Sequence, residues 1–223
     1  MRFHPDETIR CLISAGPTRE YFDPVRFLSN PSTGKMGYAI AQAAAKVGWD
    51  VKLVSGPVAL ECPEECERIM VETGQQMYEA IDGLYDSCDI LIMTAAVMDY
   101  RPKEQSDHKV KKDKLSMMVE MEATVDILKA MGKKKKNQML VGFAAETKDV
   151  EAYAAGKLKE KNCDYIVANQ VGISGGGFAS DSNSVIVLGK DGSHWNMGPE
   201  SKTKIAEELV RYFQKIVEYA SRS

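Results

Sequence analysis

The sequence predicts an α/β fold: a doubly wound, mostly parallel, Rossmann-like sheet with flanking helices. Short apolar runs alternate with helical stretches along most of the chain. The run at 89–97 is the most apolar of them, as expected for a central strand that is buried on both faces. Neither an internal repeat nor an interdomain linker is visible, so residues 1–223 are expected to form one domain.

In the first half of the chain, strands and helices are expected to alternate. Strands are predicted at 8–15, 51–54, 68–72 and 89–97, and helices at 34–47 and 73–85. Gly48 should end the first helix as its C-cap, and Thr73 should cap the second helix. Residues 21–28 are expected to form a long connection rather than a tight turn.

A polar segment at 100–115 interrupts this alternation directly after the central strand. It is highly charged and lacks hydrophobic periodicity, and long segments of this kind in compact domains are lids, binding loops or disordered. We interpret the segment either as a mobile flap that brings Lys109 over a bound nucleotide, or as a solvated hairpin or dimerisation arm.

The second half of the chain is expected to resume the pattern and to close with a hairpin and a helix. Strands are predicted at 117–123, 138–143 and 164–168, helices at 124–131 and 150–162, and a flexible loop at 175–183. The C-terminal hairpin should pair 184–188 with 193–197, and the last helix, at 201–219, is amphipathic.

The composition excludes several classes of function. Of the 223 residues 44% are hydrophobic and 27% are charged, and the net charge of -3 indicates neither a nucleic-acid surface nor a membrane surface. The basic run at 133–136 is expected to be a solvated turn. No apolar stretch reaches transmembrane length, no secretory signal is visible, and the cysteines fit a reduced, cytoplasmic protein. Cys62 and Cys66 have no second Cys/His pair, so no metal site is expected.

The segment between the first strand and the first helix is the strongest functional candidate. Ser32 and Thr33 are good N-caps, and Gly34 and Gly37 let a ligand approach the backbone closely. Because a helix start presents unpaired N–H groups, we expect nucleotide phosphates here, with Asn30 pointing at the reacting centre. The alternative is an ordinary helix start with glycine for packing. The spacing fits neither a P-loop nor Gly-x-Gly-x-x-Gly.

Further candidates follow other strand ends. Ligands of doubly wound sheets bind outside the carboxyl ends of the strands, so Gly16 and the segment 95–99 should line the same crevice. Lys157 and Lys161 lie four residues apart on one helix face, which suggests a phosphate between them; simple solvation is the alternative. The residues alone therefore indicate a phosphate-binding α/β enzyme.

Motifs with one family's spacing run through nearly the whole chain in order. They are AGPTRE at 15–20, DPVRFLSN at 23–30, STGKMG at 32–37, LVSGP at 53–57, AAVMDY at 95–100, KVKK at 109–112, GFAAET at 142–147, IVAN at 166–169, GF at 177–178 and SDSN at 180–183. Together they resemble phosphopantothenoylcysteine synthetase, the ligase that follows a flavin-dependent decarboxylase in many bacterial bifunctional coenzyme A proteins. The decarboxylase half is absent, so the chain resembles a stand-alone synthetase or an excised ligase domain.

This resemblance implies a two-step ligation. The carboxylate of 4'-phosphopantothenate attacks the α-phosphate of CTP, which gives an acyl-cytidylate and pyrophosphate, and the amine of L-cysteine then displaces CMP. Mg2+ is expected to bind mainly through the nucleotide phosphates. The family also implies a homodimer in which the flap contributes at or near the interface, with a separate flavin-dependent decarboxylase as a candidate partner. The residues do not decide between CTP and ATP.

The resemblance also assigns roles to residues. The implied catalytic residues are Asn30, which would hold the acyl-phosphate, and Lys109. The implied nucleotide-binding residues are Gly16, Ser32, Gly34, Gly37, Met93, Thr94, Ala95, Asp99, Lys109, Asp126, Ile127, Phe143, Lys157 and Lys161. The implied substrate-binding residues are Asn30, Ala96 and Asn169. One departure is Thr124-Val125, which stands where the family usually has Asn-Pro.

Two other functions are compatible with the predicted fold. A nicotinamide-dependent oxidoreductase could use a similar sheet, but the glycine fingerprint and a Tyr-x-x-x-Lys pair are missing. A non-catalytic nucleotide-binding module would not require both Asn30 and Lys109.

Overall fold

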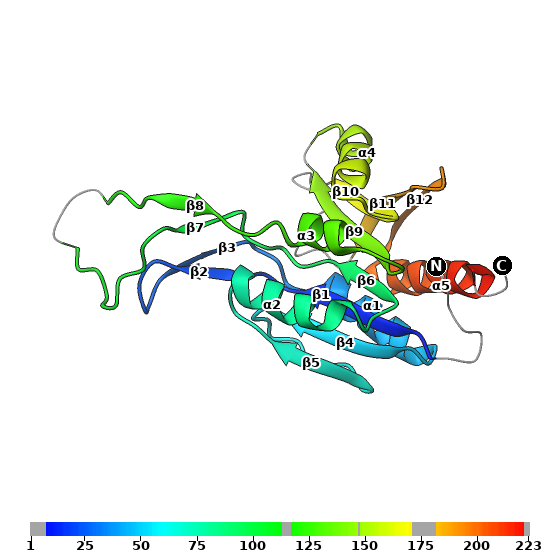
Figure 1. Cartoon of the computed structure of the whole chain (residues 1–223), viewed down its shortest axis with the longest axis horizontal. Coiled ribbons are helices and arrows are strands. Elements are labelled where there is room, and N and C mark those ends of the chain that lie inside the picture. The colour runs from blue at the N-terminus through cyan, green and yellow to red at the C-terminus, as the bar shows by residue number, and fades with distance from the viewer. Residues whose placement is uncertain (1–7, 113–116, 147, 171–181, 221–223) are drawn as a thin grey trace.

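The computed structural model describes residues 8–112, 117–146, 148–170 and 182–220 (Figure 1). Its main feature is an eight-stranded sheet in the order β12-β11-β10-β9-β6-β1-β4-β5. The strands are β1 (Arg10–Ala15), β4 (Asp50–Ser55), β5 (Cys66–Met70), β6 (Ile90–Met93), β9 (Met139–Glu146), β10 (Tyr165–Gln170), β11 (Ser182–Gly189) and β12 (His194–Ser201). Neighbouring strands from β5 to β10 are parallel, and β10, β11 and β12 pair antiparallel to one another in turn. The predicted mostly parallel sheet is confirmed.

The direction of winding reverses between β1 and β6. The chain passes from β1 outward to β4 and β5, and then returns to β6 on the other side of β1. This is the topology of a doubly wound sheet, in which the reversal opens a crevice at the carboxyl ends of the strands.

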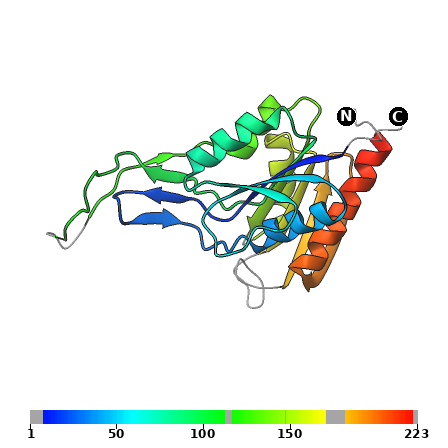
Figure 2. The same cartoon turned by 90° about the horizontal axis from the view of Figure 1, so that it is seen from below.

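The helices cover both faces of the sheet (Figure 2). One face packs against α1 (Lys35–Lys46) and α5 (Lys202–Ala220), and the other packs against α2 (Gly74–Tyr85), α3 (Ile127–Lys134) and α4 (Val150–Glu160). Successive strand residues contribute to opposite faces: Ile13 belongs to the first cluster and Leu12 to the second. This explains the continuous apolar runs, since the central strands are buried on both sides.

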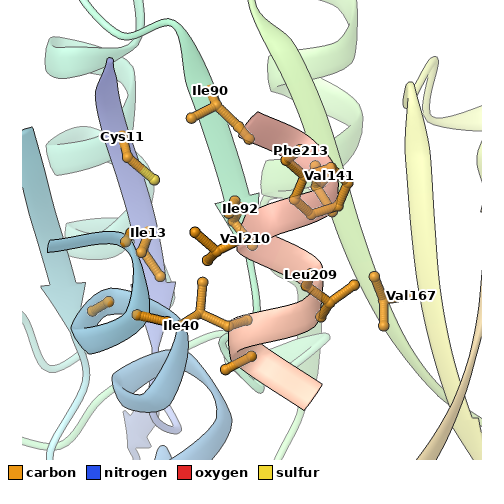
Figure 3. Close-up of a cluster of buried hydrophobic side chains, with 14 of the residues drawn as sticks. Cys11, Ile13, Ile40, Ile90, Ile92, Val141, Val167, Leu209, Val210 and Phe213 are labelled. Carbon is orange, nitrogen blue, oxygen red and sulfur yellow. The ribbon is translucent and has the colours of Figure 1, made fainter. Parts of the chain in front are cut away.

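The core between the sheet and α5 is densely aliphatic. Figure 3 shows Ile13, Ile92 and Val167 of the sheet facing Leu209 and Phe213 of α5. Each of these side chains is at most 1% exposed. Full burial of such a side chain contributes about 1.5–3 kcal/mol, so this layer fixes α5 and α1 firmly on the sheet.

The helix ends confirm some local predictions and correct others. Thr73 caps α2 in a capping box with Gln76, and Gly48, with a φ of 85°, follows the end of α1. The N-cap of α1, however, is Gly34 rather than Ser32 or Thr33, because the chain enters the helix in the left-handed region at a φ of 76°.

The helix expected at 124–131 begins later than predicted. Its first residue is Ile127, because Asp126 is the N-cap and its Oδ1 accepts a hydrogen bond from the backbone N–H of Lys129 at 2.9 Å.

Two short antiparallel pairs extend from one side of the sheet (Figures 1 and 2). They are β2 (Arg19–Tyr21) with β3 (Phe27–Ser29), and β7 (Tyr100–Pro102) with β8 (Met121–Ala123). The expected long connection at 21–28 is therefore wrong, because this segment folds back as a hairpin. Pairing of β7 with β8 favours the hairpin-arm interpretation of the polar segment at 100–115.

The C-terminal hairpin and helix are confirmed as β11, β12 and α5. Most of the loop expected at 175–183 lies outside the described residues, and its last two residues belong to β11. The basic run is not simply solvated: Lys135 is nearly buried and pairs with Asp164 at 2.9 Å. None of the described helices has the length and apolar character needed to cross a membrane.

Candidate functional site

A cleft of about 680 Å³ lies over the carboxyl ends of β6, β9 and β10. Its wall includes residues from the starts of α1, α3 and α5 and from α4, so it reaches both faces of the sheet. Fifteen of the predicted site residues line it together: Asn30, Ser32, Gly34, Gly37, Met93, Thr94, Ala95, Ala96, Asp99, Asp126, Ile127, Phe143, Lys157, Lys161 and Asn169. A cleft at this place in a doubly wound sheet is the expected ligand site.

The start of α1 forms one part of the wall. A Cβ atom at Gly37 would lie 2.4 Å from Thr94 Oγ1 and 2.6 Å from Ala15 Cβ, so glycine allows α1 to sit directly on the strand ends. The Thr94 hydroxyl donates to the carbonyl oxygen of Ser14 at 2.6 Å, which uses its proton within the protein. The first N–H groups of α1 consequently stand at the cleft, where an anion could accept from them.

Asn30 is held in a defined orientation across the cleft. Its Nδ2 donates to the carbonyl oxygens of Ala96 at 3.2 Å and Val97 at 3.1 Å. Because both partners are acceptors, only the –NH2 group can face them, and the amide cannot be turned around. Within the described structure this leaves Oδ1, an acceptor, as the polar atom that Asn30 can offer to a ligand.

Lys157 of α4 and Lys161, the C-cap of that helix, are already paired with carboxylates. Lys157 Nζ lies 2.7 Å from Glu146 Oε1, and Lys161 Nζ lies 2.5 Å from Asp126 Oδ2 and 3.1 Å from Glu160 Oε1. Burial alone would lower the pKa of Lys161, but hydrogen bonds to the two carboxylates outweigh it and raise the pKa above its ordinary value. Lys161 therefore stays charged beside the cleft, and solvation alone does not describe it.

The departure from the family pattern at Thr124 forms its own contacts. The Thr124 hydroxyl donates to the carbonyl oxygen of Met98 at 2.5 Å, and its backbone N–H donates to that of Asp99 at 2.9 Å. These bonds attach the end of β8 to the segment after β6 and so build one side of the cleft.

Gly16 is one of two predicted site residues that do not line the described cleft. Its φ is 75°, and a Cβ atom there would approach Val58 Cγ1 to 2.9 Å. Its carbonyl oxygen accepts from the backbone N–H of Ala96 at 2.9 Å. Gly16 therefore contributes to the cleft indirectly, because its backbone carbonyl holds Ala96, which lines the cleft.

Lys109 is the second such residue. The polar segment that carries it, residues 100–112, forms an arm that is hydrogen-bonded to the hairpin of β2 and β3 and extends away from the sheet (Figure 1). Ser106 N–H donates to the carbonyl oxygen of Phe22 at 3.0 Å, and Val110 N–H donates to Asp23 Oδ2 at 3.1 Å. A single chain in this arrangement does not bring Lys109 to the cleft.

Asp23 is the central residue of this attachment. Its carboxylate is fully buried and accepts from the backbone N–H groups of Val25 at 2.9 Å and Arg26 at 2.8 Å, as well as from Val110. The Arg26 guanidinium bonds both Asp23 and, at 2.7 Å, the carbonyl oxygen of Val110. The hydrogen bond from Arg26 is the main reason why the pKa of Asp23 lies well below its ordinary value, and burial acts against it.

Replacing Asp23 by Asn is expected to lower the stability of the protein at neutral pH and to reduce its dependence on pH. A carboxylate whose pKa is lowered in the folded state stabilises it above the unfolded pKa of about 4, and this stabilisation disappears as the pH falls towards the folded pKa. Urea unfolding of wild type and Asp23→Asn between about pH 7 and pH 3 should therefore show a difference in the free energy of unfolding that becomes smaller as the pH falls. Glu104→Gln, at an exposed acid of the same arm, is the control. A difference in unfolding free energy that does not change with pH would contradict the lowered pKa of Asp23 in the folded protein.

Sequence reasoning assigned no site role to several polar residues of the cleft wall, among them Asn183 and Lys202. Asn183 belongs to a motif that carries the family resemblance, but no role was assigned to it. Lys202 had no signal at all, because a lysine at the start of a surface helix is ordinary. The described residues contain no group of three His, Cys, Asp or Glu that could hold a metal ion.

Comparisons with known proteins agree on one family. The model of the family described as "DNA/pantothenate metabolism flavoprotein C-terminal domain" matches residues 7–217. The coenzyme A biosynthesis bifunctional protein CoaBC of Bacillus subtilis (strain 168) is 50% identical over 208 residues, which are 93% of this chain and 51% of that protein. This chain thus spans about half the length of the curated relatives it matches.

Solved structures show the same relationship. The crystal structure of the C-terminal domain of the coenzyme A biosynthesis bifunctional protein CoaBC matches with a TM-score of 0.82 and 44% identity, over 97% of this chain and 99% of that chain. A Cab2 mutant in complex with phosphopantothenate-cysteine matches with a TM-score of 0.78 over 96% of this chain and 89% of that chain, and its 14% identity makes this a likeness of fold.

Proposed function

This chain belongs to the DNA/pantothenate metabolism flavoprotein C-terminal domain family, and from this membership we propose that it joins 4'-phosphopantothenate to L-cysteine with CTP as the activating nucleotide. Membership confirms the family resemblance carried by the motifs. The observation that supports the proposal most is the single cleft in which fifteen of the residues implied by that resemblance meet, at the reversal point of the sheet. Residues so far apart in the sequence share a wall only because the fold brings the strand ends together.

The proposed reaction has two displacements. A carboxylate oxygen of 4'-phosphopantothenate attacks the α-phosphorus of CTP, and the bond to the β-phosphate breaks to release pyrophosphate. The amine of L-cysteine then attacks the acyl carbon of the acyl-cytidylate, the bond to the CMP oxygen breaks, and the amine loses a proton. Neither step requires an oxidant or a reductant. Both require that negative charge be stabilised and that the reacting groups be held in line.

The α1 end of the cleft suits the phosphates. Ser32, Gly34 and Gly37 line the cleft beside the first N–H groups of the helix, where the helix dipole favours negative charge, and the two glycines let this end of α1 pack closely on the protein around it. Lys157 of α4 and Lys161 at the C-cap of that helix supply two further positive charges, each oriented by a carboxylate. Phe143 and the segment 93–95 would hold the base and ribose, with Asp99.

Asn30 is proposed to act on the second step. Its two amide hydrogens are used by Ala96 and Val97, so it offers an acceptor, which suits an attacking amine better than a phosphoryl oxygen. This refines the expectation that Asn30 holds the acyl-phosphate: it would orient the cysteine amine towards the acyl carbon.

Lys109 would reach the cleft only if the arm that carries it moved, or if a second copy of the chain supplied it. The role of this lysine, the homodimer and the separate decarboxylase remain proposals drawn from the family. An arm that projects from the sheet is compatible with Lys109 reaching the cleft of a second copy.

Mg2+ is proposed to bind with the nucleotide rather than in a cage of side chains. Only two carboxylates line the described cleft, Asp99 and Asp126, and Asp126 is already engaged by Lys161 and by the start of α3. This donor set suits an ion held mainly by phosphate oxygens and water, whose chemistry would be to neutralise charge on the phosphates.

The proposed function is tested by the requirements for pyrophosphate release. We expect release from CTP only when 4'-phosphopantothenate and Mg2+ are present, and formation of the amide product only after L-cysteine is added. ATP, GTP and UTP should be compared in the same assay, and their binding measured by thermal shift. CTP binding without any turnover would indicate a nucleotide-binding module, and binding of NADH without CTP would indicate an oxidoreductase.

A further inference from the structure

Thr18 lies between β1 and β2 and is hydrogen-bonded to both of the segments that meet at Asn30. Its Oγ1 accepts from the backbone N–H of Met98 at 3.0 Å, and its carbonyl oxygen accepts from the hydroxyl of Ser29 at 2.8 Å. Its own N–H donates to the carbonyl oxygen of Ala96 at 3.4 Å. Thr18 therefore joins the residue before Asn30 to the segment that accepts from the Asn30 amide.

The bond between Met98 and Thr18 fixes one particular peptide group. The Met98 N–H and the Val97 carbonyl belong to the same peptide unit, and the Asn30 amide donates to that carbonyl at 3.1 Å. A trans peptide is planar, so its N–H and its C=O point in opposite directions. Because Thr18 holds the N–H on one side, the carbonyl is held facing Asn30 on the other.

The direction of this peptide decides which atom Asn30 offers to the cleft. With the carbonyl facing it, the amide presents its –NH2 group to the peptide, and Oδ1 is left for a ligand. If the peptide turned over, its N–H would face Asn30 and attract Oδ1. The cleft would then meet an amide donor in place of an acceptor.

Thr18 is too deeply buried to act on a ligand itself. It is 0% exposed, and it does not belong to the described wall of the cleft. The segment after β6 is also held at the next carbonyl, where the Thr124 hydroxyl donates to Met98 at 2.5 Å. The acceptor for the Met98 N–H, however, is Thr18 Oγ1, so any effect of this hydroxyl on the reaction must pass through the peptide to Asn30.

We infer that Thr18 is a positioning residue, whose hydroxyl fixes the peptide between Val97 and Met98 and thereby the orientation in which Asn30 presents Oδ1. The role rests on the proposed function, in which Asn30 orients the amine of L-cysteine. The Thr18 hydroxyl should consequently matter for the second step, in which the amine attacks the acyl carbon. It should matter little for the first step, in which pyrophosphate leaves.

The test compares Thr18→Val with Thr18→Ser in the full chain. Valine keeps the shape of threonine but cannot accept from the Met98 N–H, whereas serine keeps the hydroxyl. Thr73→Val is the matched control, because it removes a hydroxyl that also accepts from a backbone N–H, that of Gln76 at 3.2 Å, but at the start of α2. Thr18→Ala is measured in the same way if Thr18→Val does not fold.

Rapid-quench measurement of both steps gives the first result. Thr18→Val should slow amide formation about 10-fold relative to pyrophosphate release, as expected for the loss of one hydrogen bond, and Thr18→Ser should restore the wild-type ratio of the two rates. Thr73→Val should lower the stability against urea and leave this ratio unchanged. An unchanged ratio in Thr18→Val, an equal loss in Thr18→Ser or the same change in Thr73→Val would overturn the inference.

Hydrogen exchange of the Asn30 side-chain amide gives a second result that does not depend on turnover. In nitrogen-15-labelled protein, its –NH2 signals are identified by NMR from their absence in Asn30→Asp. They should exchange about 10-fold faster in Thr18→Val than in wild type, and at the wild-type rate in Thr18→Ser. Unchanged exchange in Thr18→Val would also overturn the inference. If wild type forms no amide product, the proposed function fails, and this measurement still decides whether Thr18 positions Asn30.

Discussion

Asn30→Asp is expected to bind CTP as wild type does, and to form the amide product more slowly by on the order of 100-fold. The reason is the two carbonyl oxygens that face the Asn30 amide, those of Ala96 and Val97. A carboxylate cannot donate to them and would be repelled by both, so the side chain would leave the position in which its remaining oxygen meets the amine. Pyrophosphate release in the first step should be much less affected, because Asn30 is proposed to act on the second.

Rapid-quench measurement of both steps, together with calorimetry of CTP binding, separates these effects. Asn137→Asp, at an exposed asparagine in the turn before β9, controls for the added charge. Product formation at the wild-type rate would remove Asn30 from the mechanism. Weakened CTP binding would instead place it in the nucleotide site.

Gly37→Ala is expected to destabilise the fold by about 1–3 kcal/mol and to weaken CTP binding at the same time. The added methyl group would lie 2.4 Å from Thr94 Oγ1 and 2.6 Å from Ala15 Cβ, and neither atom can withdraw, since Thr94 is bonded to Ser14 and Ala15 is part of β1. The start of α1 must therefore move off the strand ends, and its N–H groups move with it.

Gly83→Ala is the matched control for this prediction. Gly83 lies inside α2, and a Cβ atom there meets nothing within 4 Å. This substitution should stabilise the protein slightly, because alanine favours a helix by up to about 1 kcal/mol over glycine. Urea unfolding and CTP titration of both variants make the comparison. Equal stability of Gly37→Ala and Gly83→Ala would show that α1 does not depend on close contact at Gly37.

The elements and the cleft could largely be predicted because their signals are local or topological. The apolar runs of β1, β6 and β9 identify strands buried on both faces, and Thr73 identifies the start of α2. The doubly wound order then places the ends of these strands at one edge, so Asn30 and the segment 95–99 could be assigned to a common site without knowing any distance, whereas Phe143 was assigned to it by the family resemblance.

The remaining features depend on contacts that no local pattern contains. The hairpin of β2 and β3 is organised by Asp23, whose partners include Val110, far along the chain. The same bond holds the arm of Lys109 away from the cleft. Lys202 reaches the wall because the pairing of β11 with β12 fixes where α5 begins. The partners of Lys161 and the orientation of Asn30 likewise follow from tertiary structure.

The proposed chemistry makes one isotopic prediction. When 4'-phosphopantothenate is labelled with oxygen-18 in its carboxylate and turned over with CTP and L-cysteine, one labelled oxygen should appear in CMP, because the carboxylate oxygen attached to the α-phosphorus stays there when the amine displaces the nucleotide. Mass spectrometry of the separated CMP measures it. Unlabelled CMP formed alongside the amide product would contradict an acyl-cytidylate intermediate and with it the mechanism assigned to this cleft.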